Sequence, residues 1–233
     1  MVLAAVCASA LWVLQRASGR RDRSAWVTFA MQLLLAAWVL VPAWLGTTPF
    51  MLAMVLVAIS AGDELASALR AALHQPKLLD LLLGHSLPLL CVAPLLLVHA
   101  QDARHIYFYY AAIELNDSFA FIVGRSLGRT PAFPRLSPGK TREGLVAGWV
   151  AASATGAALS FFEPHWSRPL CALIGLVLGI AATLADLAAS WLKRRAQLKD
   201  FSDVLPGHGG VLDAYDSLLL AAPVWYLLVT ELA

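Results

Sequence analysis

The sequence predicts an all-α, polytopic integral membrane protein with seven or eight transmembrane helices and polar cytoplasmic loops. Its 233 residues are 60% hydrophobic and 14% charged, whereas soluble domains have about 45–50% apolar and about 25% charged residues. Several apolar runs reach the roughly 20 residues that a spanning helix needs. No linker, low-complexity tract or internal repeat divides the chain, so residues 1–233 are expected to form a single domain.

Eight apolar runs define the predicted spans. They occupy residues 2–15, 25–46, 48–62, 78–100, 105–124, 144–163, 169–192 and 211–231. The first and third are short for a full crossing, so we predict tilted or partial spans there. Residues 63–77 are amphipathic and are predicted to form a helix that lies at the membrane interface. We expect the helices of 1–104 to anchor the protein and those of 105–233 to carry its chemistry.

The basic residues indicate how the chain is oriented. If all eight runs cross the membrane, the connections on one side hold all but two of the 17 Lys and Arg residues, and only Arg104 and Arg168 lie opposite. The positive-inside rule places the basic connections in the cytoplasm and both termini outside. We therefore expect a multi-pass protein of an inner or cytoplasmic membrane, with its active site on the cytoplasmic side.

Among the acidic residues within or at the start of predicted spans, five are the most informative: Glu114, Asp117, Asp186, Asp213 and Asp216. A carboxylate at the centre of a transmembrane helix costs about 2.5–3.5 kcal/mol. These groups therefore need a wet cavity, a cation or a partner. For Glu114, pairing with a neighbouring side chain is an equally good explanation.

The spacing of polar residues in the last two spans favours a metal site. Asp213 and Asp216 are three residues apart and share a helix face, and Asp186, Ser190 and Lys193 share a face of the preceding span. Carboxylates from two helix ends would supply the oxygen ligands that Mg²⁺ prefers, usually together with water and substrate phosphates. Mg²⁺, alone or with a second cation, is the expected cofactor.

The segment PGHGG, residues 206–210, directly precedes the last predicted span. Its glycines let the backbone approach a ligand closely, and the following helix start would offer free N–H groups to an anion. This predicts a polyphosphate site. A plain glycine turn would explain the glycines, but not His208 or the two aspartates that follow.

A second polar loop contains SPGKT, residues 137–141. It lacks the earlier glycine and the preceding strand of a P-loop, so that motif is rejected. Ser137, Lys140 and Thr141 remain candidates for binding phosphate, as hydroxyl donors and a point charge.

Three stretches carry a family resemblance. SWLKRRAQLKDFSDVLPGHGGVLDAYDSL, residues 190–218, approximately follows the pattern S-x-x-K-R-x4-K-D-x7-G-H-G-G-x-x-D-R-x-D. NDSFAFIVGRSLGR follows D-[ST]-x-A-[YF]-x-x-G-[KR], and LSPGKTREG follows S-P-x-K-T-x-E-G. These patterns resemble those of the phosphatidate cytidylyltransferases, the CDP-diacylglycerol synthases. The stretches extend over residues 116–218, nearly half of the chain. The N-terminal half is similar to the family only in its hydrophobic character.

The resemblance implies a Mg²⁺-dependent enzyme of phospholipid biosynthesis that transfers CMP from CTP to phosphatidate and releases pyrophosphate. Its partners would be CTP and a lipid of the bilayer, not nucleic acid, and a homodimer is allowed. Transferred by position, Asp186, Asp213 and Asp216 would bind the metal and, with Lys193 and Lys199, form the catalytic set. The implied substrate-binding residues are Asp117, Ser137, Lys140, Thr141, Ser190, Arg194, Arg195, Asp200, His208, Gly209 and Gly210.

One departure from the family pattern bears on activity. The pattern D-R-x-D reads Asp213, Ala214, Tyr215, Asp216 here, so an arginine is missing. The chain could act on phosphatidate, act on a different lipid phosphate, or bind substrates without turnover. We hypothesise that Arg195 partly supplies the missing positive charge.

Two other classes of protein stay open. A transporter would also carry intramembrane carboxylates, but it predicts broken helices in both halves of the chain, whereas the polar features crowd into the C-terminal half here. A non-catalytic scaffold would explain the missing arginine, but not the many site residues that are present.

Overall fold

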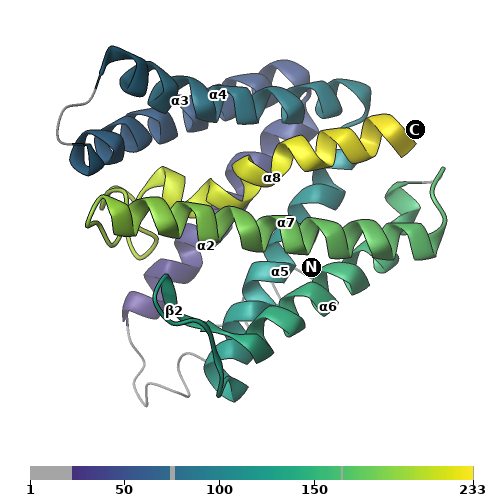
Figure 1. Ribbon diagram of the computed structural model, residues 1–233. Coiled ribbons are helices and arrows are strands. Elements are labelled where there is room, and N and C mark those ends of the chain that lie inside the picture. Colours follow the sequence, from purple (N-terminus) through teal and green to yellow (C-terminus); the bar gives the residue numbers. More distant parts are fainter. Residues whose placement is uncertain (1–22, 74–76, 164, 233) are drawn as a thin grey trace.

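The structure, a computed structural model, describes residues 23–73, 77–163 and 165–232, and these confirm an all-α architecture (Figure 1). The first predicted span, 2–15, lies outside the described residues. The helices of the described part are α2 (Arg23–Leu45), α3 (Thr47–Ala72), α4 (Leu78–Gln101), α5 (Arg104–Leu127), α6 (Arg142–Ala158), η1 (Ser160–Phe162), α7 (Arg168–Arg195) and α8 (Val211–Leu232). Two short strands, β1 (Pro131–Phe133) and β2 (Ser137–Thr141), connect α5 to α6.

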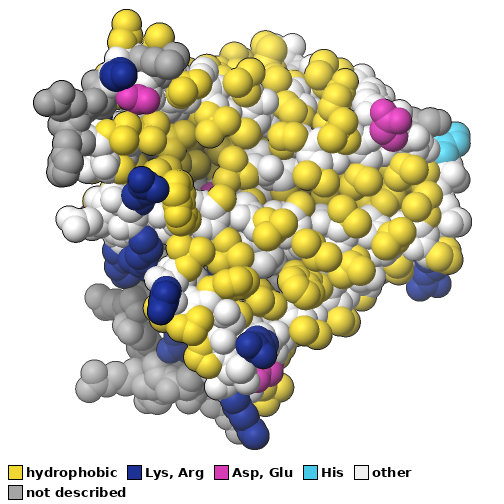
Figure 2. All heavy atoms as spheres, in the orientation of Figure 1, with side chains coloured by type: hydrophobic (Ala, Val, Ile, Leu, Met, Phe, Trp, Pro, Cys, Tyr) yellow, Lys and Arg dark blue, Asp and Glu magenta, His cyan; other side chains and the backbone are white. Residues whose placement is uncertain are grey.

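Five of these helices are long and apolar enough to cross a membrane: α2, α3, α4, α7 and α8. Helix α6 has 17 residues, fewer than the roughly 20 that a straight crossing needs. Helix α5 is long enough with 24 residues, but Glu114, Asp117 and Arg125 lower its hydropathy. Hydrophobic side chains cover much of the face in Figure 2, as expected for a surface that contacts lipid.

The predicted interfacial helix over 63–77 is wrong. Residues 48–62 and most of 63–77 belong to one continuous helix, α3. Its C-terminal half packs against α4, because a side chain at Gly84 of α4 would lie 2.8 Å from the backbone of Ala66. The polar side chains of this half suggested an interface, but its small residues, among them the buried Ala61 and Ala68, form a helix–helix contact.

The polar loop after α5 is a hairpin, which the sequence analysis did not predict. Strands β1 and β2 pair in antiparallel fashion, with Pro131 opposite Thr141 and Phe133 opposite Ser137. The hydroxyl of Thr141 then accepts a hydrogen bond of 3.2 Å from the N–H of Gly144 and caps α6. The hairpin therefore fixes the SPGKT segment at the point where the chain enters α6.

Close helix packing positions the central helices. A side chain at Gly148 of α6 would lie 2.7 Å from the carbonyl oxygen of Asn116 on α5, and one at Gly175 of α7 would lie 2.3 Å from that of Ala152. Only glycine allows such backbone approach. Near the start of α5 and the end of α8, Phe108 stacks on the fully buried Trp225 with ring centroids 5.5 Å apart. The charged groups of α7 and α8 gather away from this aromatic cluster, toward the C-terminal end of α7 and the start of α8.

Candidate active site

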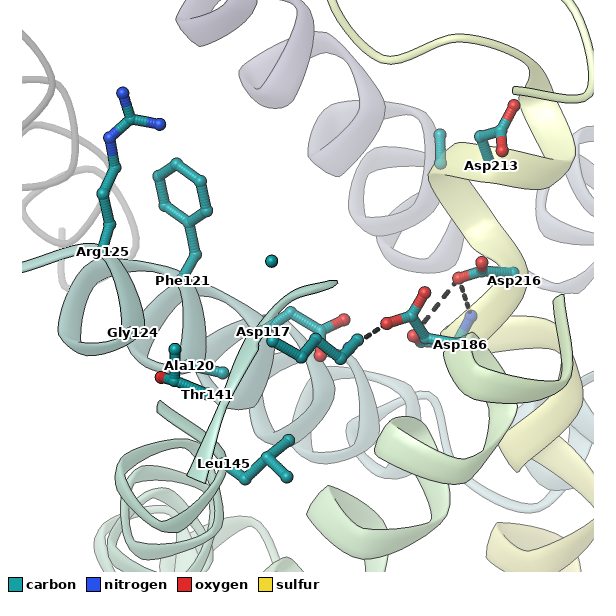
Figure 3. A pocket seen from close by; sticks show the side chains of 14 residues that line it. Asp117, Ala120, Phe121, Gly124, Arg125, Thr141, Leu145, Asp186, Asp213 and Asp216 are labelled. Atoms are coloured by element: carbon teal, nitrogen blue, oxygen red, sulfur yellow. Dashed lines mark hydrogen bonds and ion pairs between the residues drawn. The ribbon is translucent and has the colours of Figure 1, made fainter. Parts of the chain in front are cut away.

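A cavity of about 530 Å³ opens where α5, β2, α7 and α8 meet (Figure 3). Its walls carry four carboxylates and two basic side chains, which come from segments far apart in the sequence. The charged lining residues are Asp117, Arg125, Lys140, Asp186, Asp213 and Asp216. All except Asp186, which precedes the stretch 190–218 by four residues, lie within the stretches that carry the family resemblance. The fold therefore brings those stretches together in space.

Three of the aspartates point toward one another across the cavity: Asp117 from α5, Asp186 from α7 and Asp216 from α8 (Figure 3). Lys140 of β2 forms an ion pair with Asp186. The backbone N–H of Ser217 donates a 2.6 Å hydrogen bond to the buried Asp216. The hairpin thus contributes its lysine to the carboxylates of the last two helices.

Asp213 lies apart from this group, about one turn earlier on α8, and both of its oxygens are engaged. Lys193 Nζ contacts Oδ1 at 2.7 Å, and the N–H groups of Phe201 and Gly210 donate to Oδ2 at 2.6 and 2.9 Å. The side chains of Lys193 and Asp213 are only 12% and 6% exposed. This buried pair fixes the end of α7 to the start of α8.

The carboxylates of the cavity form only part of a Mg²⁺ site. Within the described ranges, no three His, Cys, Asp or Glu side chains lie close enough to hold one metal ion together. Asp186 and Asp216 nevertheless face each other, and Mg²⁺ often binds one or two carboxylates and completes its shell with water and substrate phosphates. In the conformation described here, Asp213 is bound to protein donors instead.

The first two N–H groups of α8 are not free, which contradicts that part of the sequence analysis. The carboxylate of Glu64 on α3 accepts hydrogen bonds from the N–H groups of Val211, at 3.0 Å, and Leu212, at 2.7 Å. A side chain at Gly210 would lie 2.5 Å from Glu64 Oε2. Gly210 therefore allows close approach of a carboxylate of the protein itself.

The other glycines also pack against the protein. Gly207 and Gly209 have φ values of 80° and 84°, which few other residues adopt without strain. A side chain at Gly209 would lie 2.8 Å from Asp213 Oδ2. Between them, His208 Nε2 lies 2.7 Å from Gln32 Oε1 of α2, and burial lowers the pKa of His208 below its ordinary value of 6.5. His208 is thus a neutral contact to α2.

The sequence of the chain was compared with those of known proteins. The model of the cytidylyltransferase family matches residues 1–232. The chain belongs to the cytidylyltransferase family. The phosphatidate cytidylyltransferase of Rickettsia typhi is 30% identical over 189 residues, which cover 77% of this chain and 80% of that protein. The phosphatidate cytidylyltransferases of Brucella abortus and Bacillus subtilis are 42% and 39% identical over 125 and 129 residues, covering 52% and 53% of this chain and 45% and 47% of theirs. The chain spans about half the length of several curated relatives that it matches.

Several family-derived site residues do not line the cavity. Lys199 is 88% exposed and lies 3.8 Å from Asp200, and Arg194 donates to the carbonyl oxygen of Leu136 in the hairpin at 3.4 Å. The guanidinium of Arg195 lies 5.3 Å from the ring centroid of Trp191. The hypothesis that Arg195 replaces the missing arginine therefore has no contact to support it. Ser137, Ser190, His208, Gly209 and Gly210 are likewise absent from the cavity lining.

Three residues that contact this part of the cytidylyltransferase fold were missed from the sequence. Gln32 and Glu64 lie outside the matching stretches, and the residues around them form no pattern that predicts a contact with the C-terminal half. Arg125 could have been found, because it occupies the final [KR] position of a quoted family block. It lines the cavity together with Ala214, the position of the departure from the family pattern.

Proposed function

We propose that this protein transfers CMP from CTP to a lipid phosphate, with phosphatidate as the principal substrate, and releases pyrophosphate. The observation that supports this most directly is the convergence of Lys140, Asp186, Asp213 and Asp216 on one cavity. Lys140 comes from one block of the family pattern and Asp213 and Asp216 from another, and Asp186 lies just before the second block. Such convergence is expected of a reaction centre, whereas a fold without chemistry has no need of it.

The charge of the cavity indicates how the substrates would bind. Four carboxylates against two basic side chains would repel a polyphosphate unless cations accompanied it. We assign Mg²⁺ to Asp186 and Asp216, and Asp213 could join them if it were released from Lys193. When bound, the ion would neutralise phosphate charge and stabilise the leaving pyrophosphate. Removing Mg²⁺ should therefore abolish both turnover and CTP binding.

The residues of the chain would then act mainly by positioning. Lys140 and Arg125 would bind phosphate oxygens as fixed positive charges, and Lys193 would hold the start of α8. A phosphate oxygen of the lipid attacks the α-phosphorus of CTP, and the bond from that phosphorus to the pyrophosphate oxygen breaks. A phosphate monoester is already largely dianionic at neutral pH, since its second pKa is about 6. No strong general base is needed.

A second candidate substrate is another lipid phosphate, because Ala214 lines the cavity where the family pattern has an arginine. The deciding experiment incubates the purified protein in mixed micelles with labelled CTP, Mg²⁺ and a panel of lipid phosphates. Formation of labelled CDP-diacylglycerol supports the proposal, and a different labelled liponucleotide favours the second candidate. If no lipid is converted while CTP still binds, the protein is a non-catalytic member of the family.

We also propose that the cavity faces the cytoplasm. Lys and Arg side chains gather at the end of the molecule where β2 and the C-terminal end of α7 lie (Figures 1 and 2), and basic ends face the cytoplasm. Cysteines at Gly139 and Ser167 should react with an impermeant thiol reagent from opposite sides, Gly139 from the cytoplasm. Labelling of both from the same side would contradict this orientation.

A further inference from the structure

The start of α8 carries a carboxylate that comes from the other half of the chain. Glu64 accepts three hydrogen bonds, from the N–H groups of Val211 and Leu212 and, at 2.7 Å, from the hydroxyl of Ser202. The partners are 147, 148 and 138 residues away in sequence. One side chain of α3 therefore holds both the loop before α8 and the first turn of the helix.

These contacts satisfy backbone groups that a helix start leaves without partners. The first N–H groups of a helix have no acceptor within it, and the positive end of its dipole favours a nearby anion. Glu64 takes the N–H groups of Val211 and Leu212, while Asp213 takes that of Gly210 at 2.9 Å. Glu64 and Asp213 together thus accept hydrogen bonds from the N–H groups of Gly210, Val211 and Leu212.

We infer that Glu64 is a positioning residue, which fixes the first turn of α8 and thereby holds Asp213 in place for the reaction. The link is short, because Asp213 lies in the turn that Glu64 caps and itself binds Lys193 of α7 at 2.7 Å. Without Glu64, the loop from Ser202 and the first turn of α8 lose their shared acceptor. The consequence for turnover rests on the proposed function, but the consequence for the helix start does not.

The direct test is hydrogen exchange, measured by mass spectrometry on the full-length protein in nanodiscs. In Glu64→Ala, the amides of Val211 and Leu212 should exchange about tenfold faster or more, because they lose a charged acceptor. The matched control is Asp63→Asn: Asp63 is the adjacent acidic residue on α3, its side chain is 69% exposed, and it contacts His85 instead of α8. Its exchange profile around α8 should match that of the wild type.

A second variant approaches the same contact from α8. Gly210 has no unusual φ that requires glycine, so Gly210→Ala perturbs mainly the approach of Glu64, whose carboxylate atoms lie 2.5–2.7 Å from the position of the new Cβ. It should show the same accelerated exchange as Glu64→Ala. Glu64→Asp, which keeps the charge but is one methylene shorter, should be intermediate.

Turnover separates positioning from mere stability. At a temperature where every variant remains folded, kcat should fall about 10- to 100-fold in Glu64→Ala, as expected when a catalytic group is slightly misplaced. It should recover partly in Glu64→Asp and stay at the wild-type value in Asp63→Asn. A stability role alone would leave kcat per folded molecule unchanged. Unchanged kcat in Glu64→Ala, or unchanged exchange at Val211 and Leu212, overturns the inference.

If the wild type converts no lipid phosphate, the proposed function fails and the position of the turn is measured directly. Spin labels at Ser67 on α3 and at Val204, which is 69% exposed in the loop, report the distance between the two elements. A broader distance distribution in Glu64→Ala than in Asp63→Asn supports the positioning role. Identical distributions refute it.

Discussion

The contacts of Asp213 and Asp186 predict that the same substitution has different effects at the two sites. Asp213→Asn leaves an oxygen for the N–H groups of Phe201 and Gly210, but turns an amino group toward the ammonium of Lys193. The lost charge-assisted hydrogen bond costs about 1.5–3 kcal/mol, and breaking a buried ion pair costs about 3–5 kcal/mol. A loss of about 3 kcal/mol lowers the melting temperature by roughly 6–12 °C for a chain of this size.

Asp186→Asn should be milder for stability. The side chains of Lys140 and Asp186 are 24% and 25% exposed at the cavity, and a pair that water reaches is worth about 1 kcal/mol or less. The melting temperature should fall by no more than roughly 2–4 °C. Turnover should nevertheless drop more than tenfold in both variants, because both carboxylates line the cavity.

The assay combines thermal unfolding in detergent with turnover of labelled CTP, measured well below the melting temperature. Asp203→Asn is the control, because Asp203 is an exposed aspartate of the loop before α8 and its substitution removes the same charge. It should behave as wild type in both measurements. Equal melting temperatures for the Asp213 and Asp186 variants would refute the reasoning, as would more than a tenth of wild-type turnover in both.

Three further predictions concern the loop before α8 and the cavity wall. Burial lowers the pKa of His208, so below about pH 6.5 the unfolded chain binds a proton at this residue more readily than the folded protein does. The melting temperature should therefore fall as the pH falls in that range, and His208→Gln should reduce this dependence of the melting temperature on pH. Gly209→Ala should reduce turnover at least tenfold, because the residue has φ 84° and its new Cβ would lie 2.8 Å from Asp213 Oδ2; wild-type activity would contradict this. Arg125→Ala should raise the KM for CTP about tenfold or more. The increase should be larger than in Arg195→Ala, because of these two arginines Arg125 lines the cavity and Arg195 does not. A larger increase in Arg195→Ala would restore the Arg195 hypothesis.

The parts of the fold that follow from local sequence were predictable. Runs of about 20 apolar residues are set by the thickness of the bilayer, so α2, α4, α7 and α8 lie close to their predicted limits. The intramembrane aspartates were equally informative, because a carboxylate in an apolar helix needs a partner wherever the fold places it. Asp117, Asp186 and Asp216 do meet in one cavity.

The parts that depend on distant contacts were not predictable in the same way. In the sequence, Glu64 is one polar residue of an amphipathic stretch. The hydrophobic pattern of that stretch is the same whether Glu64 faces water or the start of α8. The acceptor is revealed only when α3 and α8 are brought together. The expectation of free N–H groups after the PGHGG segment was wrong for the same reason: a glycine that admits a ligand and one that admits a carboxylate of the protein look alike in sequence.

The contacts of the buried acids bear on the case for a bound metal ion. Each has a partner within the protein: Gln32 for Glu114, Asn116 for Asp117, Lys140 for Asp186, Lys193 for Asp213 and Ser217 for Asp216. Lys140 and Lys193 neutralise Asp186 and Asp213 without any metal ion, whereas Gln32, Asn116 and Ser217 are neutral donors that offset only part of the cost of a buried carboxylate. The argument from burial alone therefore does not require Mg²⁺ at Asp186 or Asp213. The case for Mg²⁺ depends instead on the substrate. A cavity with more carboxylates than basic groups cannot favour a triphosphate until cations neutralise part of that charge. CTP binding should consequently depend on divalent cations more steeply than folding does.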